Sequence, residues 1–216
     1  MGVEIFSSSM NKKTYLFSIS SHPNAISVNS LDIKLLKPKI DFHKYDYFII
    51  TSKQVSKALK QYGENELILK NALCISSQTA KSYEELGGYV LELGSGYGDG
   101  LVDKIKAYSK DVKWLYLRAE TIASDFVSIC KKDGYKIDEV IMYESACSKD
   151  ILEIEVEDNA TLIFTSPSSV KCFLKKHTIS KDNSIVVIGL STAKAIPKDI
   201  SFHVAKENTI ESCFDV

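Results

Sequence analysis

The chain alternates short apolar runs with longer segments in which apolar residues recur every three or four positions. The short runs predict nine β-strands, at residues 14–19, 47–51, 72–76, 89–93, 113–117, 136–143, 161–165, 185–189 and 202–205. Several of them, such as residues 48–50 and 185–188, are almost continuously apolar. Such strands are covered on both faces, as in a parallel sheet with helices on each side.

Four segments between the strands carry an apolar stripe at helical spacing, and three of them end in glycine, the residue that most easily takes the left-handed conformation after a helix. The stripes are Val55, Ala58, Leu59 and Tyr62; Ala80, Tyr83 and Leu86; Ile122, Phe126, Ile129 and Cys130; Val170, Phe173 and Leu174; the glycines are Gly63, Gly87 and Gly134. A last helix is expected to begin at Asn208, with Glu211 three positions on as in a capping box. The alternation of strands and helices predicts an α/β fold with parallel sheets.

Two sequence patterns occur twice. Residues 48–55 resemble residues 162–170, and residues 73–81 resemble residues 186–194. The spacing between the patterns is also similar, because Thr51 and Thr79 lie 28 positions apart and Thr165 and Thr192 lie 27 apart. Two copies of one β/α unit predict two similar small domains.

Each copy places hydroxyl side chains where a strand ends and a helix begins. These residues are Thr51 and Ser52, Ser76 and Thr79, Thr165 and Ser166, and Thr192. Ligands of open parallel sheets bind outside the carboxyl ends of the strands, and helix N-termini there favour anions. Serine and threonine are also the ordinary N-caps of helices, so one such residue alone favours a cap. The repetition favours a ligand site, and one side chain can serve both purposes.

Composition narrows the classes of ligand. The 216 residues include 27 basic and 28 acidic side chains, and a net charge of −1 argues against a general nucleic-acid or membrane binder. With 44% hydrophobic and 25% charged residues the chain is typical of a soluble globular protein. Arg118 is the only arginine. Planar capture of carboxylates therefore comes from at most one side chain, and hydroxyls, lysines and backbone N–H groups must do the rest.

Cysteine and histidine usage predicts neither a disulfide framework nor a metal site. The five cysteines are odd in number and none are at CxxC spacing, and the four histidines are isolated. We expect buried thiols in a reducing, cytoplasmic compartment. The N-terminus lacks the pattern of a secretory signal. Residues 1–9 are interpreted as an extension or remnant before a natural start near Met10.

Three further features have an ordinary structural explanation. The glycine-rich segment 94–100 does not fit GxGxxG or a P-loop, and it is interpreted as a connector. Tyr143 ends a strand, where a tyrosine commonly packs with its hydroxyl in water. Arg118 also ends a strand, where a surface ion pair is the simplest role. No Ser/His/Asp, Cys/His or paired-carboxylate arrangement indicates a hydrolase.

Taken in order, segments 45–55, 76–80, 115–118, 140–143, 164–170 and 188–193 resemble the uroporphyrinogen-III synthase family, from about Lys13 to the C-terminus. The resemblance implies two flavodoxin-like α/β domains with parallel sheets, joined by a two-stranded linker. Residues 1–37 and 148–216 would form a discontinuous domain and residues 42–140 the inserted one. The linker would comprise residues 33–41 and 141–147.

The same resemblance implies an activity. Members cyclise and dehydrate hydroxymethylbilane, a linear tetrapyrrole polycarboxylate, with inversion of ring D, and give uroporphyrinogen III for haem biosynthesis. They use no cofactor or metal. A monomer would bind the substrate between its domains. Tyr143 matches the tyrosine expected to hydrogen-bond the departing hydroxyl. The residues expected at the carboxylates are Thr51, Ser52, Lys53, Ser76, Thr79, Arg118, Thr165, Ser166, Ser168 and Thr192.

The sequence departs from the family at two points and leaves two other functions open. Many members have an arginine after the first strand, where Phe17 and Ser18 stand here, and a glycine where Ser76 stands. The alternatives are a two-domain small-molecule binding or sensory protein without catalysis, and a nucleotide-binding regulator that uses segment 94–100. An excess of the type III over the type I product isomer would favour the synthase.

Overall fold

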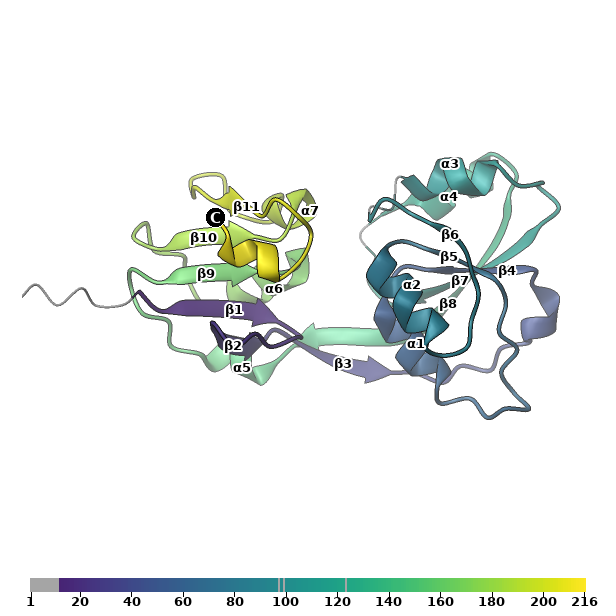
Figure 1. Cartoon of the computed structure of the whole chain (residues 1–216), viewed down its shortest axis with the longest axis horizontal. Coiled ribbons are helices and arrows are strands. Elements are labelled where there is room, and N and C mark those ends of the chain that lie inside the picture. The colour runs from purple at the N-terminus through teal and green to yellow at the C-terminus, as the bar shows by residue number, and fades with distance from the viewer. Residues whose placement is uncertain (1–11, 97, 99, 123) are drawn as a thin grey trace, which may run out of the picture. The chain divides into compact units, whose positions relative to one another are not determined.

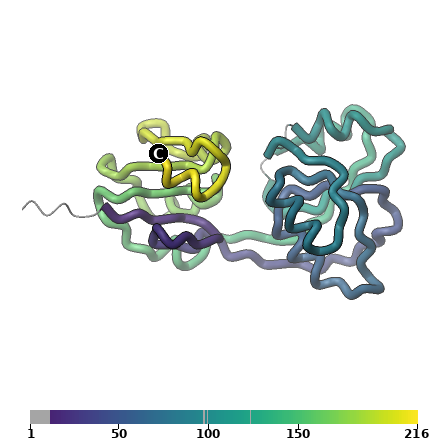
Figure 2. Tube along the Cα trace, in the orientation of Figure 1, coloured from purple at the N-terminus to yellow at the C-terminus, as the bar shows by residue number. Residues whose placement is uncertain are grey.

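The structure is a computed structural model that describes residues 12–96, 98, 100–122 and 124–216. The chain divides into two compact units. Unit 1 contains the described residues up to Asp32 together with Ala146–Val216, and unit 2 contains Ile33–Ser145. Figure 2 shows the purple N-terminal strand in the same unit as the green and yellow C-terminal segments. The proposed extension, residues 1–9, lies outside the described residues.

Unit 1 contains a five-stranded parallel sheet with the order β11-β10-β9-β1-β2 (Figure 1). The strands are β1 (Thr14–Ser18), β2 (Ile26–Asn29), β9 (Thr161–Phe164), β10 (Ser184–Val187) and β11 (His203–Val204). Numbered within the unit, this order is 2-1-3-4-5, which is the flavodoxin-like arrangement. The strand order therefore reverses between β1 and β9, where a ligand site is expected.

Both faces of this sheet are covered. Leu162 and Phe164 of β9 lie in a cluster with α5 (Lys149–Glu153) and α6 (Pro167–Phe173), whereas Ile163 lies in a second cluster with Cys213 of the 3₁₀ helix η2 (Glu211–Phe214). The short helix α7 (Leu190–Ala193) follows β10. Alternate residues of one apolar strand thus enter different cores, which confirms the interpretation of the continuous apolar runs.

Unit 2 contains a six-stranded sheet with the order β3-β8-β7-β4-β5-β6. The strands are β3 (Leu31–Leu35), β4 (Tyr47–Ile50), β5 (Ala72–Cys74), β6 (Val90–Leu93), β7 (Lys113–Ala119) and β8 (Lys136–Cys147). The pairs from β8 to β6 are parallel, and β3 runs opposite to β8 in Figure 1. The five parallel strands have the order 3-2-1-4-5, so the reversal lies between β4 and β7.

Two helices cover each face of this sheet. Phe48 and Ile50 lie in a cluster with residues of α1 (Lys53–Leu59) and α2 (Ser77–Glu84), and Ile49 lies in a cluster with α3 (Gly100–Lys106) and α4 (Phe126–Lys132). A 3₁₀ helix, η1 (Phe42–Lys44), precedes β4. All nine predicted strands are present, within a few residues at their ends.

The differences from the predicted elements concern chain segments with weak patterns. Strands β2 and β3 were not predicted from the apolar pattern, because they are short and only partly buried. Strand β3 overlaps the linker segment 33–41 that the family resemblance implies. Helix α4 begins at Phe126, which leaves Ile122 outside it and exposed. The expected helix at Asn208 is wrong. The chain forms η2 from Glu211 instead, and the Thr209 hydroxyl, not Asn208, accepts from the Ser212 N–H.

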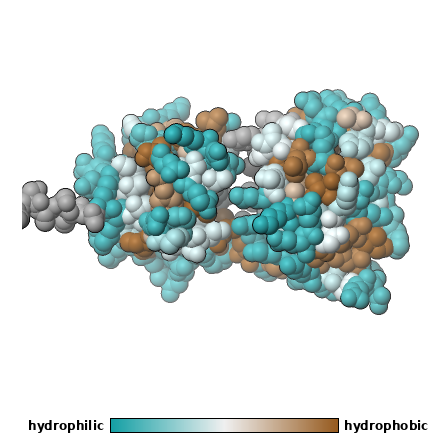
Figure 3. All heavy atoms as spheres, viewed as in Figure 1, coloured by the Kyte–Doolittle hydropathy of each residue, from teal (hydrophilic) through white to brown (hydrophobic). Residues whose placement is uncertain are grey.

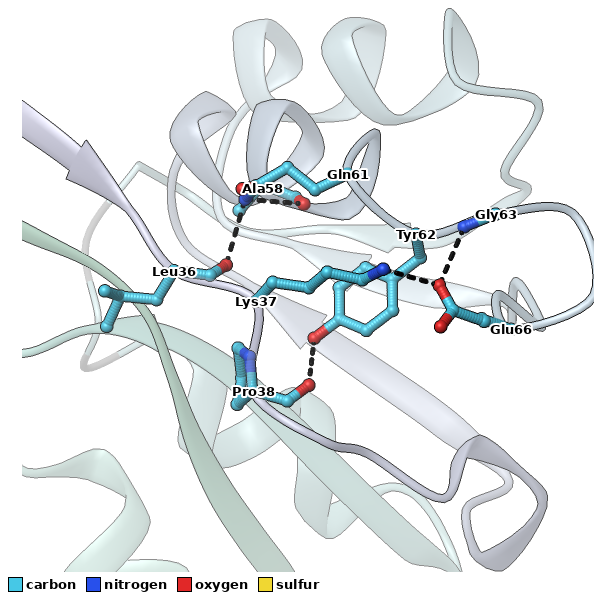
Figure 4. A network of polar contacts seen from close by, with 8 residues as sticks. All are labelled: Leu36, Lys37, Pro38, Ala58, Gln61, Tyr62, Gly63 and Glu66. Carbon is cyan, nitrogen blue, oxygen red and sulfur yellow. Dashed lines mark hydrogen bonds and ion pairs between the residues drawn. The ribbon is translucent and has the colours of Figure 1, made fainter.

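The segment that follows β3 is fastened to the end of α1 (Figure 4). Gln61 Nε2 donates to the Leu36 carbonyl at 3.0 Å, and the Tyr62 hydroxyl donates to the Pro38 carbonyl at 2.5 Å. Lys37 Nζ lies 2.7 Å from Glu66 Oε2, which also accepts from the Gly63 N–H. These contacts hold residues 36–38, which follow β3, against the C-terminal end of α1. Ser52 caps the N-terminal end of the same helix.

The cysteines correct an expectation from the sequence. Cys147, at the end of β8, and Cys172, on α6, form a disulfide with a Cα–Cα distance of 5.3 Å. Spacing along the chain could not show this pair, because the fold brings the two residues together from 25 positions apart. The other three, Cys74, Cys130 and Cys213, are free and buried, as expected.

Hydrophilic residues occupy much of the surface in view, with apolar patches between them (Figure 3). The exposed large apolar side chains include Ile19, Leu93, Ile122 and Leu190, which all lie just beyond or at the carboxyl ends of strands. Among the described residues, no helix is both long and apolar enough to cross a membrane.

Candidate functional site

The carboxyl edge of the unit 2 sheet carries a group of hydroxyls at the strand reversal. Thr51 follows β4, and its Oγ1 lies 3.0 Å from the hydroxyl of Tyr116, which belongs to the neighbouring strand β7. Tyr116 is 3% exposed, and burial raises the pKa of its phenol. The hydrogen bond to Thr51 acts in the opposite direction. This edge thus contains a neutral, fixed phenol that sequence reasoning missed.

Tyr143 completes this group from strand β8. It pairs with Ala119 at the end of β7 and is half-buried. Burial raises the pKa of the Tyr143 phenol, and the nearby Ser52 side chain partly opposes that shift. Ser52 is also the N-cap of α1, where its oxygen accepts from the Gln54 N–H at 3.2 Å. Tyr143 is therefore a neutral hydrogen-bond donor at pH 7.

A second pair of hydroxyls lies after β5. Ser76 is the N-cap of α2 and accepts from the Thr79 N–H at 3.4 Å, and the two side-chain oxygens are 3.2 Å apart. Thr79 is buried and Ser76 half-buried. The cap and the predicted binding role are compatible, because a hydroxyl that accepts one hydrogen bond can still donate its own hydrogen.

Arg118 already has several partners within unit 2. Its Nη1 donates to the carbonyls of Ala119 and Glu120 at 2.8 and 2.9 Å, and its Nε lies 3.0 Å from Glu139 Oε1. The Nε–carboxylate contact is an ion pair, whereas the angles for a hydrogen bond are not met. The guanidinium thus fastens the end of β7. Lys53, the first residue of α1, is half-buried beside this edge.

The carboxyl edge of unit 1 repeats the arrangement. Thr165 follows β9 and donates from Oγ1 to the Phe17 carbonyl of β1 at 3.2 Å, directly at the strand reversal. Ser166 is the N-cap of α6 and forms a capping box with Ser169, with bonds of 3.0 and 3.2 Å. Ser168 is exposed on the first turn. The Thr-Ser pairs of both units therefore stand at equivalent places.

Thr192 differs from the other hydroxyls. It lies in α7 and is 1% exposed, and its Oγ1 has no hydrogen-bond partner among the described residues. A buried hydroxyl without a partner is unfavourable by about 1–3 kcal/mol. The side chain must turn, or α7 must shift, before this oxygen meets a ligand. Its contact with a substrate stays a prediction.

The two edges share a chemical character. Each combines neutral hydroxyls with exposed apolar side chains, which are Ile19 and Leu190 in unit 1 and Leu93 and Ile122 in unit 2. Such edges suit an acidic ligand with an apolar body. The apolar part was missed from the sequence, because Ile19 and Leu93 were assigned to strands and Ile122 to a helix. Leu190, directly after a predicted strand, was the one usable signal. Among the described residues, no three potential ligands gather as a metal site would require.

These features define a two-unit α/β protein with hydroxyl side chains at the carboxyl edges of its parallel strands. The family model described as Uroporphyrinogen-III synthase HemD matches residues 24–215, and the chain belongs to this family. Its members are cyclising lyases of haem biosynthesis, and the chain is an enzyme of this class. The match confirms the resemblance seen in the sequence and decides against a binding protein without catalysis.

Two solved structures have a similar fold. Uroporphyrinogen-III synthetase from Helicobacter pylori 26695 aligns with a TM-score of 0.74 at 19% identity, over 94% of this chain and 97% of that one. A mutant uroporphyrinogen III synthase from Thermus thermophilus aligns with a TM-score of 0.60 at 13% identity, over 89% and 87%. A search of curated protein sequences gives no match. The structural likeness confirms the α/β fold class.

Proposed function

We propose that Tyr143 assists the loss of the hydroxyl from hydroxymethylbilane and that the hydroxyl-bearing strand ends of both units bind the substrate carboxylates. The observation that carries this proposal is the half-buried phenol of Tyr143 at the carboxyl edge of unit 2, where burial raises its pKa and keeps it neutral. A phenol donates a hydrogen bond without carrying charge at pH 7, which suits a hydroxyl that leaves as water.

The chemistry demands control of shape more than a strong acid. Loss of the hydroxyl as water leaves a resonance-stabilised azafulvene. Attack by the substituted carbon of the last pyrrole gives a spiro intermediate, which fragments and recloses with that ring inverted. Closure without the enzyme gives the isomer that is not inverted. The protein must therefore favour one geometry of a flexible chain, and positioning alone can supply much of the rate.

The carboxylates would be held by hydroxyls whose hydrogens are not committed elsewhere. Ser52, Ser76 and Ser166 accept hydrogen bonds from the first turns of their helices and keep an O–H to donate. Ser168 is exposed beside Ser166 and can turn freely. Thr51, Thr79 and Lys53 lie close to the same strand ends, and Thr165 would have to exchange its hydrogen bond to the Phe17 carbonyl for one to the substrate. Arg118 would contribute through the nitrogen that its backbone partners do not use.

The pyrrole rings would contact the apolar side chains at the same edges. Leu190 is 62% exposed and Ile19 is 40% exposed, although both are residues that usually lie inside. A tetrapyrrole needs apolar surface for its rings and donors for its acids, and each edge offers both.

An isomer assay tests the proposal. The protein is incubated with hydroxymethylbilane, and the product isomers are separated after oxidation to porphyrins. We expect type III to exceed type I, whereas buffer alone gives type I. Tyr143→Phe should lower the rate about tenfold to a hundredfold, because one positioned donor is lost. Tyr89→Phe, at a residue 66% exposed, is the matched control. Full activity of Tyr143→Phe would refute the proposed role of Tyr143.

The proposal includes a monomer in the cytoplasm, with a small molecule as its partner and no nucleic acid. The free thiols of Cys74, Cys130 and Cys213 support a reducing compartment, whereas the disulfide of Cys147 does not. Sedimentation of the purified protein tests whether it is a monomer, and a dimer at the concentration of the activity assay would contradict this. Fractionation of the source cells tests the cytoplasmic location.

A further inference from the structure

The opposite edge of the unit 2 sheet contains a cavity away from the candidate active site. It has a volume of about 400 Å³ and is lined by Lys44, Tyr45, Lys113, Trp114, Lys136 and Asp138. These residues stand where β4, β7 and β8 begin, whereas Tyr143 and Thr51 stand where strands end. Strand β7 is seven residues long, which separates the two edges by roughly 20 Å. The cavity is therefore distinct from the candidate active site.

The charge around this cavity is unbalanced at the strand starts. Lys113 of β7 and Lys136 of β8 are register partners on neighbouring strands. Like charges in such a pair repel each other. An ion pair partly offsets the charge of Lys136, because its Nζ lies 3.1 Å from an oxygen of the exposed Asp111. Lys113 forms no ion pair within the part of the chain that the structure describes. An anion placed over both lysines would remove this repulsion.

Asp138 in the cavity lining keeps its negative charge, and the three lysines of the lining outnumber it. Asp138 Oδ2 accepts from the Tyr45 hydroxyl at 2.9 Å, which also holds the tyrosine ring at the wall. Lys44 Nζ lies 3.6 Å from Asp41 Oδ2. A second cavity of about 370 Å³ shares Lys44 and Tyr45 and adds Lys39 and the apolar Ile40. The two cavities together contain four lysines beside the aromatic ring of Tyr45 and the aliphatic side chain of Ile40.

We propose that this surface, defined by Lys44, Tyr45, Lys113 and Lys136, binds a small planar aromatic anion with two or more carboxylates. The volume lies in the range of small-molecule pockets, which favours a compact ligand over a peptide. Carboxylates on a flat ring reach lysines on different strands at once, and the ring packs on Tyr45. Lysine is a suitable partner, because its long stem lets the charge follow the ligand.

Trp114 is the only tryptophan in the chain, and it is buried directly behind the cavity wall, so its fluorescence can report on a ligand bound there. Benzene-1,2,4,5-tetracarboxylate is titrated into the full chain while tryptophan fluorescence and heat are recorded, and benzoate serves as the single-charge comparison. We expect saturable binding that weakens as salt rises, because exposed charges are screened. Benzoate should bind at least about tenfold more weakly, since one carboxylate cannot meet two lysines.

Charge reversal localises the site. Lys113→Glu should weaken binding of the tetracarboxylate about tenfold or more, whereas Lys175→Glu, which makes the same net change on unit 1, should leave it within about twofold. Lys136→Ala is the second variant if Lys113→Glu does not fold. The proposal is overturned if the native chain shows no saturable binding, if both lysine variants of the pair bind normally, or if Lys175→Glu loses as much affinity. The isomer assay on Lys113→Glu should be unchanged, so this result is independent of the function of Tyr143.

Discussion

At the residue scale, the hydroxyl side chains at the strand ends have two tasks that do not conflict. Ser52, Ser76 and Ser166 each use an oxygen lone pair to cap a helix. The same oxygen keeps a hydrogen to donate, so the group that starts the helix can also bind an anion. The sequence showed these residues clearly because the cap and the ligand contact require the same residue types at the same place.

The pH dependence of the reaction should report the state of Tyr143. Burial raises its pKa, so the phenol stays protonated and able to donate at pH values where an ordinary tyrosine, with a pKa near 10, begins to ionise. We therefore expect the activity that depends on this phenol to persist at pH values where an ordinary tyrosine ionises, and to fall at higher pH. Tyr143→Phe should lack this alkaline component. Lysines also lose charge there, but they do so in both proteins, so the difference between their rate profiles isolates the phenol.

The hydrogen bond between Tyr116 and Thr51 should contribute to stability. Tyr116→Phe and Thr51→Val each remove one partner of the 3.0 Å contact, and each should lower the free energy of unfolding by about 1 kcal/mol. The double variant should lose less than the sum, because the two changes remove one bond. Urea unfolding of the four proteins measures this coupling. Strict additivity would show that the contact contributes nothing.

At the element scale, what the sequence predicted depended on how strongly burial constrained each segment. Strands such as β4 and β9 carry an apolar residue at nearly every position because both faces are covered, and their pattern was clear. Strands β2 and β3 are half-exposed, and their short mixed patterns were not recognised. Tyr116 was missed for a related reason. Its ring belongs to the core, and only the neighbouring strand shows that its hydroxyl reaches Thr51.

Helix α6 allows the cap and the binding role to be separated. Ser166 caps the helix in a reciprocal pair with Ser169, so Ser166→Ala should lower the free energy of unfolding by about 1 kcal/mol. Ser168 is exposed on the same turn and takes part in no capping bond, so Ser168→Ala should be neutral in stability. Both changes should raise KM for hydroxymethylbilane with a smaller effect on kcat. Stability losses without any change in KM would limit Ser166 to a structural role.

At the scale of the whole molecule, the sequence repeat corresponds to a shared place in two different sheets. In unit 2 the repeated strands are β4, at the strand reversal, and its neighbour β5. In unit 1 they are β9, at the reversal, and its neighbour β10. Across the reversal, however, β4 meets β7, which comes later in the chain, whereas β9 meets β1, which comes earlier. The repeat therefore predicted two related units. Their strand orders differ, and this could not be predicted, because it depends on pairing between strands that are far apart in the sequence.

The disulfide gives the last prediction at this scale, because it joins the end of β8 to α6 across 25 positions. Unfolded without reductant, the chain should expose three titratable thiols, from Cys74, Cys130 and Cys213, and five after reduction. In the native state few should react, since burial raises the pKa of Cys74 to about 12 and that of Cys213 to about 11. Cys172→Ser should lower the free energy of unfolding by about 3 kcal/mol, because the open loop regains freedom in the unfolded chain. Cys213→Ser is the control for the stability measurement, because Cys213 forms no disulfide. In the thiol titration, five thiols in the unreduced, unfolded protein would contradict the disulfide. That result would agree with the reducing compartment expected from the sequence.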